Sequence, residues 1–154
     1  MTHTSSIADR LVGTWTLTGF TLQVEGLPPI LPMGPNVKGY GSWGADGWMS
    51  FLVETAERPL WDSPAPDGGT DAQTIAAARS LLAYAGPYTI DEAAGTIAQR
   101  LQHCLIPNWV GDVHLRSVRF PGDGQMELTS DPSPTPAGAG RFVLTFTRRP
   151  ATVL

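Results

Sequence analysis

The chain consists of short apolar segments separated by turn residues. These segments are rich in Val, Thr, Phe, Trp and Tyr, whose branched or flat side chains suit a pleated strand. We expect eight strands, at residues 13–24, 38–43, 47–54, 87–91, 96–105, 113–120, 125–129 and 141–149. Residues 45–47 and 91–95 predict hairpin turns, because Asp and Gly tolerate the positive φ of a tight reversal.

One segment follows a different pattern. Residues 70–85 are rich in alanine, and Ile75 and Leu82 lie a heptad apart. Thr70 and Gln73 have the spacing of a capping box, and Gly86 followed by Pro87 is a typical helix stop. We therefore expect one α-helix at about 70–85, between the third and fourth strands.

Eight antiparallel strands are best accommodated in a closed barrel. An open sheet of this size leaves edges that invite aggregation, whereas closure removes them. A barrel of eight strands encloses its own side chains and one small ligand. The expected fold is thus all-β, an eight-stranded antiparallel barrel with one helix, and a β-sandwich is the alternative that periodicity leaves open. No repeat or linker divides residues 1–154, so we expect a single domain.

Composition narrows the set of partners. The 154 residues are 42% apolar and 16% charged, and the net charge is −4 with Lys38 as the sole lysine, so we expect no nucleic-acid partner.

No apolar run reaches the ~18–20 residues of a membrane helix, and the first six residues lack the pattern of a signal peptide. The single cysteine, Cys104, excludes an internal disulfide and fits a reducing compartment. We expect a cytoplasmic protein without a membrane partner. The oligomeric state stays open, with a homodimer as one alternative.

Several blocks of sequence resemble a known family. They are Leu-Val-Gly-Thr-Trp at 11–15, Asp-Gly-Trp-Met-Ser at 46–50, Tyr-Ala-Gly-Pro-Tyr-Thr-Ile-Asp at 84–91, Pro-Asn-Trp-Val-Gly at 107–111 and Leu-x-Phe-x-Arg at 144–148. In this order they are similar to the lipocalin-like domain family of bacteria and fungi, along nearly the whole chain.

The resemblance implies a lipocalin-like barrel with a small-molecule cavity. It also implies that Trp15 closes one barrel end beneath an arginine of the last strand, either Arg148 or Arg149. Related small barrels include cofactor-free cyclases of natural products. The chain departs from the family pattern at Gln99 and Arg100, where many members carry a histidine, so the role of that histidine is not carried over.

His103 is the first candidate for chemistry. Alternation along residues 96–105 places Gln99 and His103 on the more apolar face, which should point into the barrel. An apolar cavity lowers the pKa of a histidine and favours the neutral imidazole, which accepts a proton near pH 7. The alternative is a core histidine that is hydrogen-bonded to a neighbour.

Arg116, Tyr84 and Tyr88 are candidates for polar contacts to a ligand. Arg116 is suited to stabilise an enolate or to hold a carboxylate, although a surface arginine is the other interpretation. Alternation does not decide which face of 113–120 points inward. Tyr84 and Tyr88 flank the expected helix exit, where a hydroxyl can orient a ligand carbonyl or simply lie in water.

The remaining candidates form walls or polar contacts of the cavity. They are Trp43, Trp48, Gln99, Trp109 and His114.

His103, His114 and Asp112 would form a metal triad if His103 and His114 faced each other across one hairpin, but we expect no metal and no cofactor. Residues 39–44 match G-x-G-x-x-G, yet a strand rather than a helix follows, which argues against a nucleotide site.

Two functions fit these features. The first is a cofactor-independent cyclase or isomerase that acts on a small hydrophobic, carbonyl-bearing, polyketide-type intermediate, with His103 as base and Arg116 and Tyr88 polarising the carbonyl. The second is a carrier that binds such a molecule without turnover. Both require the same apolar cavity, so the sequence does not separate them. A metal-assisted hydrolase built on the two histidines is a weaker third hypothesis.

Overall fold

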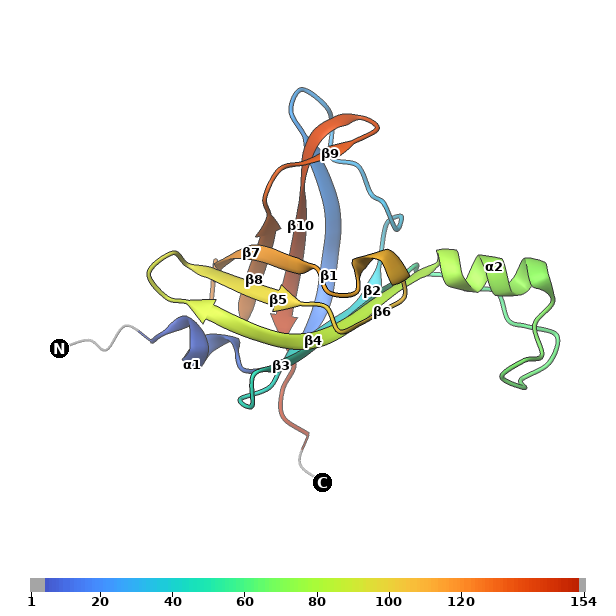
Figure 1. Cartoon of the computed structure of the whole chain (residues 1–154), viewed down its shortest axis with the longest axis horizontal. Coiled ribbons are helices and arrows are strands. Elements are labelled where there is room, and N and C mark those ends of the chain that lie inside the picture. The colour runs from blue at the N-terminus through green and yellow to red at the C-terminus, as the bar shows by residue number, and fades with distance from the viewer. Residues whose placement is uncertain (1–4, 153–154) are drawn as a thin grey trace.

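The computed structural model describes residues 5–152, which form a β-barrel with two short α-helices. Figure 1 shows the barrel, with α2 projecting from its side. The elements in chain order are α1 (Ile7–Leu11), β1 (Gly13–Val24), β2 (Lys38–Trp43), β3 (Trp48–Glu54), α2 (Asp71–Arg79), β4 (Leu81–Asp91), β5 (Thr96–Arg100), β6 (His103–Cys104), the 3₁₀ turn η1 (Pro107–Trp109), β7 (Val113–Arg119), β8 (Gln125–Ser130), β9 (Ser133–Thr135) and β10 (Gly138–Arg148).

Eight of the strands close into a ring. Their order is β1-β2-β3-β4-β5-β7-β8-β10, and β10 pairs with β1. All of these pairings are antiparallel. The two short strands lie outside the ring, with β6 paired to β4 and β9 paired to β10. The predicted eight-stranded antiparallel barrel is therefore confirmed, and the β-sandwich alternative is wrong.

A bulge in β1 explains how one strand serves two parts of the barrel. The register with β10 shifts between Leu17 and Gly19, and the buried positions change from Trp15 and Leu17 to Phe20, Leu22 and Val24. One extra residue reverses the alternation, so apolar side chains face inward on both sides of the bulge. Beyond it, β1 and β10 continue as the long ribbon at the top of Figure 1.

The barrel end next to α1 is packed solid. Trp15, Trp43, Met49, Met126 and Phe146 are each at most 2% exposed there. Trp43 meets Phe146 edge-on, with ring centroids 5.8 Å apart. Leu11 of α1 is fully buried, and its carbonyl accepts a hydrogen bond of 2.8 Å from Trp15 Nε1. The interior of this end is therefore filled by side chains.

The predicted helix at 70–85 has the correct start and the wrong end. Thr70 and Gln73 form the expected capping box, but the helix ends at Arg79 and β4 begins at Leu81. Gly86 and Pro87 lie inside β4 rather than after a helix. A Cβ on Gly86 would lie 1.8 Å from the Arg100 carbonyl oxygen. Gly86 is thus required by the close approach of two backbone segments, which is the second common use of glycine.

The predicted strand at 96–105 is interrupted. β5 ends at Arg100, Leu101 N bonds to Asp112 O at 2.9 Å, and Gln102 N bonds to Ala85 O at 2.9 Å. Ile97, Gln99 and Leu101 point inward as expected, but the irregularity at 101–102 reverses the alternation. His103 is consequently exposed, while Cys104 packs against the core.

Candidate functional site: an apolar cavity with one polar wall

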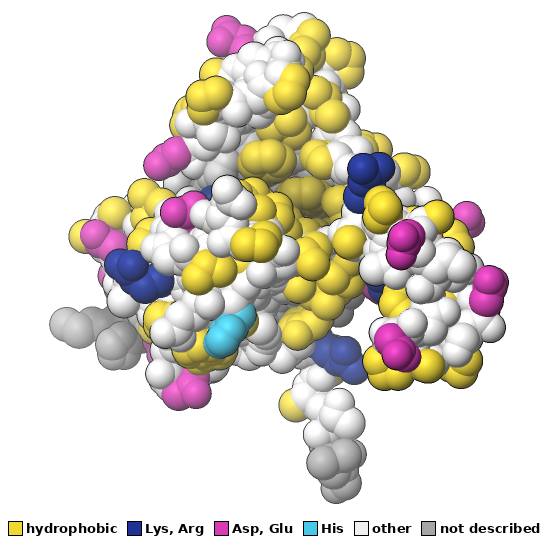
Figure 2. Space-filling view, turned by 45° about the vertical axis from the view of Figure 1, so that its right-hand side comes forward, with side chains coloured by type: hydrophobic (Ala, Val, Ile, Leu, Met, Phe, Trp, Pro, Cys, Tyr) yellow, Lys and Arg dark blue, Asp and Glu magenta, His cyan; other side chains and the backbone are white. Residues whose placement is uncertain are grey.

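A cavity of about 680 Å³ occupies the barrel end opposite α1. Figure 2 shows it as a hollow in which hydrophobic side chains gather. A volume of this size is in the range of small-molecule sites. Hydrophobic side chains make up most of its lining: Phe20, Pro32, Met33, Phe51, Ala78, Leu81, Leu82, Leu105, Ile106, Trp109, Val113, Leu115, Pro132, Phe142 and Leu144.

Aromatic rings form the walls of the cavity. Phe20 of β1 stacks on Phe142 of β10, with centroids 5.7 Å apart and planes 10° apart. Phe51 of β3 lies 5.0 Å from the Tyr84 ring of β4. Trp109, which η1 positions, contacts His114 edge-on at 5.1 Å. The rings come from five separate elements, so the barrel holds flat surfaces on several sides of one space.

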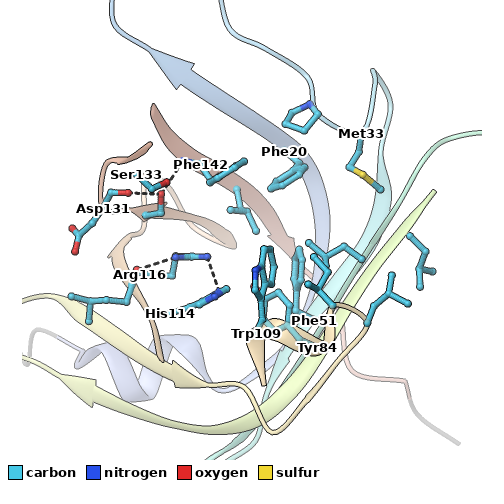
Figure 3. Close-up of a pocket in the computed structure, with 18 of the residues that line it drawn as sticks. Phe20, Met33, Phe51, Tyr84, Trp109, His114, Arg116, Asp131, Ser133 and Phe142 are labelled. Atoms are coloured by element: carbon cyan, nitrogen blue, oxygen red, sulfur yellow. Dashed lines mark hydrogen bonds between the residues drawn. The ribbon is translucent and has the colours of Figure 1, made fainter. Parts of the chain in front are cut away.

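Three polar side chains of the lining, His114 and Arg116 of β7 and Tyr84 of β4, form what we call the polar wall. The other polar lining residues are Arg79 at the end of α2, Ser130 at the end of β8, Asp131, and Ser133 at the start of β9. Figure 3 shows His114 and Arg116 side by side, with Tyr84 and Trp109 next to them. The inward face of β7 carries His114, Arg116 and Val118, while Val113 and Leu115 are 48% and 41% exposed at the cavity edge. The structure thus shows that the face of β7 with His114 and Arg116 points into the barrel, which alternation alone did not decide.

The Arg116–His114 contact fixes the imidazole tautomer. Arg116 Nη2 lies 3.3 Å from His114 Nδ1. A guanidinium only donates hydrogen bonds, so Nδ1 is the acceptor and a neutral imidazole carries its proton on Nε2. Burial, and next the positive charge of Arg116, lower the pKa of His114 from its usual 6.5, against a smaller opposite effect of Asp112. His114 is therefore neutral at pH 7 and offers Nε2–H as a donor.

Tyr84 completes the polar wall. Its side chain is 6% exposed, and its ring meets His114 edge-on at 5.8 Å. Burial raises the pKa of the Tyr84 phenol, although the charge of Arg116 opposes part of this effect. The phenol is neutral at pH 7 and retains its O–H donor. Arginine, histidine and tyrosine thus all present donors at this wall.

Four of the nine predicted site residues line this cavity, namely Tyr84, Trp109, His114 and Arg116. The predicted inward orientation of His103 is wrong, because the break after Arg100 turns its ring outward against Trp48, at 6.3 Å between centroids. Trp48 itself is 39% exposed, since Met49, Phe51 and Val53 take the inward face of β3.

The other three predicted residues lie below the cavity, toward α1. Trp43 is part of the solid core. Gln99 is 1% exposed and does not reach the cavity lining. The Tyr88 hydroxyl donates to the Gly44 carbonyl at 2.7 Å, and burial, with a smaller effect of Asp46, raises the pKa of this phenol. Tyr88 thus holds the β2–β3 turn instead of a ligand.

The metal-triad hypothesis fails on geometry. His114 pairs with Gln99 of β5, while His103 pairs with Ala85 of β4, so the two histidines do not face each other across one hairpin. Among residues 5–152, no three His, Cys, Asp or Glu side chains lie together in a way that would hold a metal ion. Likewise, no helix in this part of the chain is long and apolar enough to cross a membrane.

Several lining residues were not anticipated. Met33 and Pro32 lie in the loop between β1 and β2, which two hydrogen bonds between Leu22 and Ile30 pin to the barrel. No local pattern marks a loop residue as part of a cavity wall. Phe20 and Phe142 did carry a signal, because both are large aromatic residues within predicted strands.

The chain is similar to several known proteins. Residues 12–149 match the profile of a family described as a lipocalin-like domain. A curated protein of Aspergillus oryzae (strain ATCC 42149 / RIB 40), named 4'-hydroxy-3'-methoxypropiophenone carrier protein, is 30% identical over 81 residues, which represent 49% of this chain and 73% of that protein. A solved redesigned β-barrel aligns over 96% of this chain and 98% of its own, with a TM-score of 0.46 and 13% identity.

Proposed function

Because the chain belongs to the lipocalin-like domain family, we propose that it is a carrier that binds a small aromatic, carbonyl-bearing molecule in this cavity without converting it. The observation that carries this proposal is the polar wall, on which each of three side chains carries an N–H or O–H donor. Arg116, His114 and Tyr84 all offer hydrogens to the cavity and would therefore hold an acceptor oxygen. The aromatic walls supply apolar contact area for a flat ring.

A base is the group that this wall lacks. In the neutral state His114 accepts from Arg116 through Nδ1, so its lone pair is already engaged. The other residues with a predicted catalytic role, His103 and Tyr88, lie outside the cavity. The name of the Aspergillus relative, a carrier of an aromatic ketone, supports binding as the function.

The test of the carrier function uses the ketone 4'-hydroxy-3'-methoxypropiophenone as probe and the quenching of tryptophan fluorescence as readout. Leu82 lines the cavity, and Leu82→Trp should fill part of it and weaken binding at least about tenfold. Val110→Trp is the matched control, because Val110 is 51% exposed and lies outside the cavity lining. Equal binding by the two variants, each shown to be folded by circular dichroism, would contradict the proposed site.

The second candidate is a cofactor-independent cyclase or isomerase of a polyketide-type intermediate. It is favoured by one observation, a neutral histidine beside an arginine in an apolar cavity. In this version His114 would release Arg116 and remove a proton next to a carbonyl, while Arg116 would stabilise the enolate.

Proton exchange separates the carrier from the enzyme. A catalytic base at this wall would speed the exchange of the α-hydrogens of the same ketone in D₂O, which NMR follows directly. For a carrier we expect bound ketone to exchange no faster than ketone in buffer. Faster exchange that is abolished in His114→Gln would favour the enzyme instead.

A further inference from the structure

The guanidinium of Arg116 has no carboxylate partner in the part of the chain that the structure describes. Its hydrogen bonds go to the Leu115 carbonyl, at 3.0 Å, and to His114 Nδ1, at 3.3 Å. Two other arginines form ion pairs, Arg58 with Glu54 at 3.1 Å and Arg119 with Glu127 at 3.0 Å, and both pairs lie outside the cavity. A guanidinium carries five N–H donors, so several donors of Arg116 remain for a ligand.

The surroundings of Arg116 make an uncompensated charge costly. The side chain is half-buried on the inward face of β7, within a cavity lined mainly by hydrocarbon. Asp131 is the only acidic residue in the lining; it is exposed, and Figure 3 shows its carboxylate directed away from the guanidinium. A charge in apolar surroundings is disfavoured unless it is paired and hydrogen-bonded, so this wall favours an arriving negative charge.

The groups next to Arg116 suit an anion as well. His114 offers Nε2–H and Tyr84 offers O–H, and no carboxylate of the described lining competes for them. Hydrogen bonds to charged acceptors are about twice as strong as those between neutral groups. The protein as a whole has a net charge of −4, so the positive character of the wall is a local feature of the cavity.

We propose that the cavity selects the anionic form of its guest: a planar aromatic molecule with a carboxylate, or with a phenol or enol that has lost its proton, whose oxygen is bound by Arg116. This inference rests on the proposed binding function and specifies the ligand class. The rings of Phe51, Trp109 and the Phe20–Phe142 stack receive the aromatic part. Arg79 of α2 also lines the cavity, but it is exposed at the cavity edge, whereas Arg116 is half-buried. Arg116 is therefore the cation that would determine the charge preference, while the rings would determine the shape preference.

A matched pair of probes tests the charge preference. 2-Naphthoate and 2-naphthamide have the same ring and nearly the same shape, and they differ in charge. Titration calorimetry at pH 7.5 should show that naphthoate binds at least about tenfold more tightly than the amide. Arg116→Gln should reduce this ratio to about one, because it weakens the binding of the anion more than the binding of the neutral amide.

Two further variants make the result specific. Arg116→Lys keeps the charge and should retain a preference for naphthoate, which also covers the case in which the glutamine variant folds poorly. Arg119→Gln removes a cation outside the cavity and should leave the ratio unchanged. Equal affinity of the wild type for the two probes would overturn this inference and leave the binding function intact. Failure of both probes and of the ketone to bind would overturn the binding function itself.

Discussion

The guanidinium of Arg148 lies over the indole ring of Trp15, with its central carbon 4.3 Å from the ring centroid. Arg148 Nη1 also donates to the Val12 carbonyl at 3.0 Å, and Nη2 donates to the Arg10 carbonyl. The last strand is thereby connected to α1 and to the start of β1. Arg149, the other arginine that the family resemblance allowed, is exposed.

The first prediction concerns this closure. Arg148→Met should lower the free energy of unfolding by about 2–3 kcal/mol, because it removes a cation–π contact and two charge-assisted hydrogen bonds. Arg149→Met is the matched control and should change it by less than about 0.5 kcal/mol. Urea denaturation measures both values. Similar losses in the two variants would show that the end-closing role does not belong to Arg148.

The second prediction concerns the His114 tautomer. Because Arg116 donates to Nδ1, the neutral ring should carry its proton on Nε2. Nitrogen-15 NMR of protein labelled at histidine distinguishes the two tautomers at pH 7.5. Arg116→Gln replaces the obligatory donor by an amide and should allow the Nδ1–H form to appear. A wild-type spectrum dominated by Nδ1–H would contradict the hydrogen bond from Arg116 to His114 Nδ1.

The third prediction follows from the lowered pKa of His114. Between the pH at which folded His114 titrates and about 6.5, the unfolded chain binds a proton that the folded chain does not bind. The free energy of unfolding should therefore fall as the pH falls through this window, and the effect should level off below it. Urea unfolding between pH 7.5 and 5 should give a shallower slope for His114→Asn than for the wild type. His103→Asn, which removes an imidazole on the outside of the barrel, serves as control.

The fourth prediction concerns Gln99. Its side chain is 1% exposed, and no atom among residues 5–152 forms a hydrogen bond with its Oε1. A buried acceptor without a partner costs about 1–3 kcal/mol, so Gln99→Leu should raise the free energy of unfolding by about 1 kcal/mol. Binding of the ketone should stay unchanged, because Gln99 lies below the cavity. A clear loss of stability would contradict this account.

The fifth prediction concerns Gly86, where two backbone segments approach each other closely. Gly86→Ala should separate β4 from the Arg100–Gln102 segment and lower the free energy of unfolding by about 3 kcal/mol or more. Gly122→Ala is the control, because its Cβ would meet only the flexible side chain of Gln125. Thermal denaturation compares the two. Equal melting temperatures would show that the backbone contact is not limiting.

The eight strands and their closure were predictable because each strand alternates apolar and polar residues and is bounded by turn residues. The number of strands, together with the cost of open edges, then left few architectures. The bounds of some elements were predicted wrongly because the same local pattern occurs in two different structural settings. Gly86-Pro87 is typical of a helix end. Here, however, position 86 requires glycine because the carbonyl oxygen of Arg100, distant in sequence, lies where a Cβ would be.

The site was predictable only where a strand runs without interruption. β7 is regular, so choosing its inward face places His114 and Arg116 together. On the 96–105 segment, one irregularity at Leu101–Gln102 was enough to turn His103 outward, and nothing in the local sequence marks it. Trp43 and Trp48 show that aromatic character alone does not distinguish a core, an outer surface and a cavity wall.

Helix α2 reaches the lip of the cavity through Ala78 and Arg79, yet it buries none of its side chains. The barrel draws little of its stability from the identity of these residues. Natural or laboratory evolution can therefore substitute residues at this edge of the cavity and change which ligands enter, while the barrel stays folded.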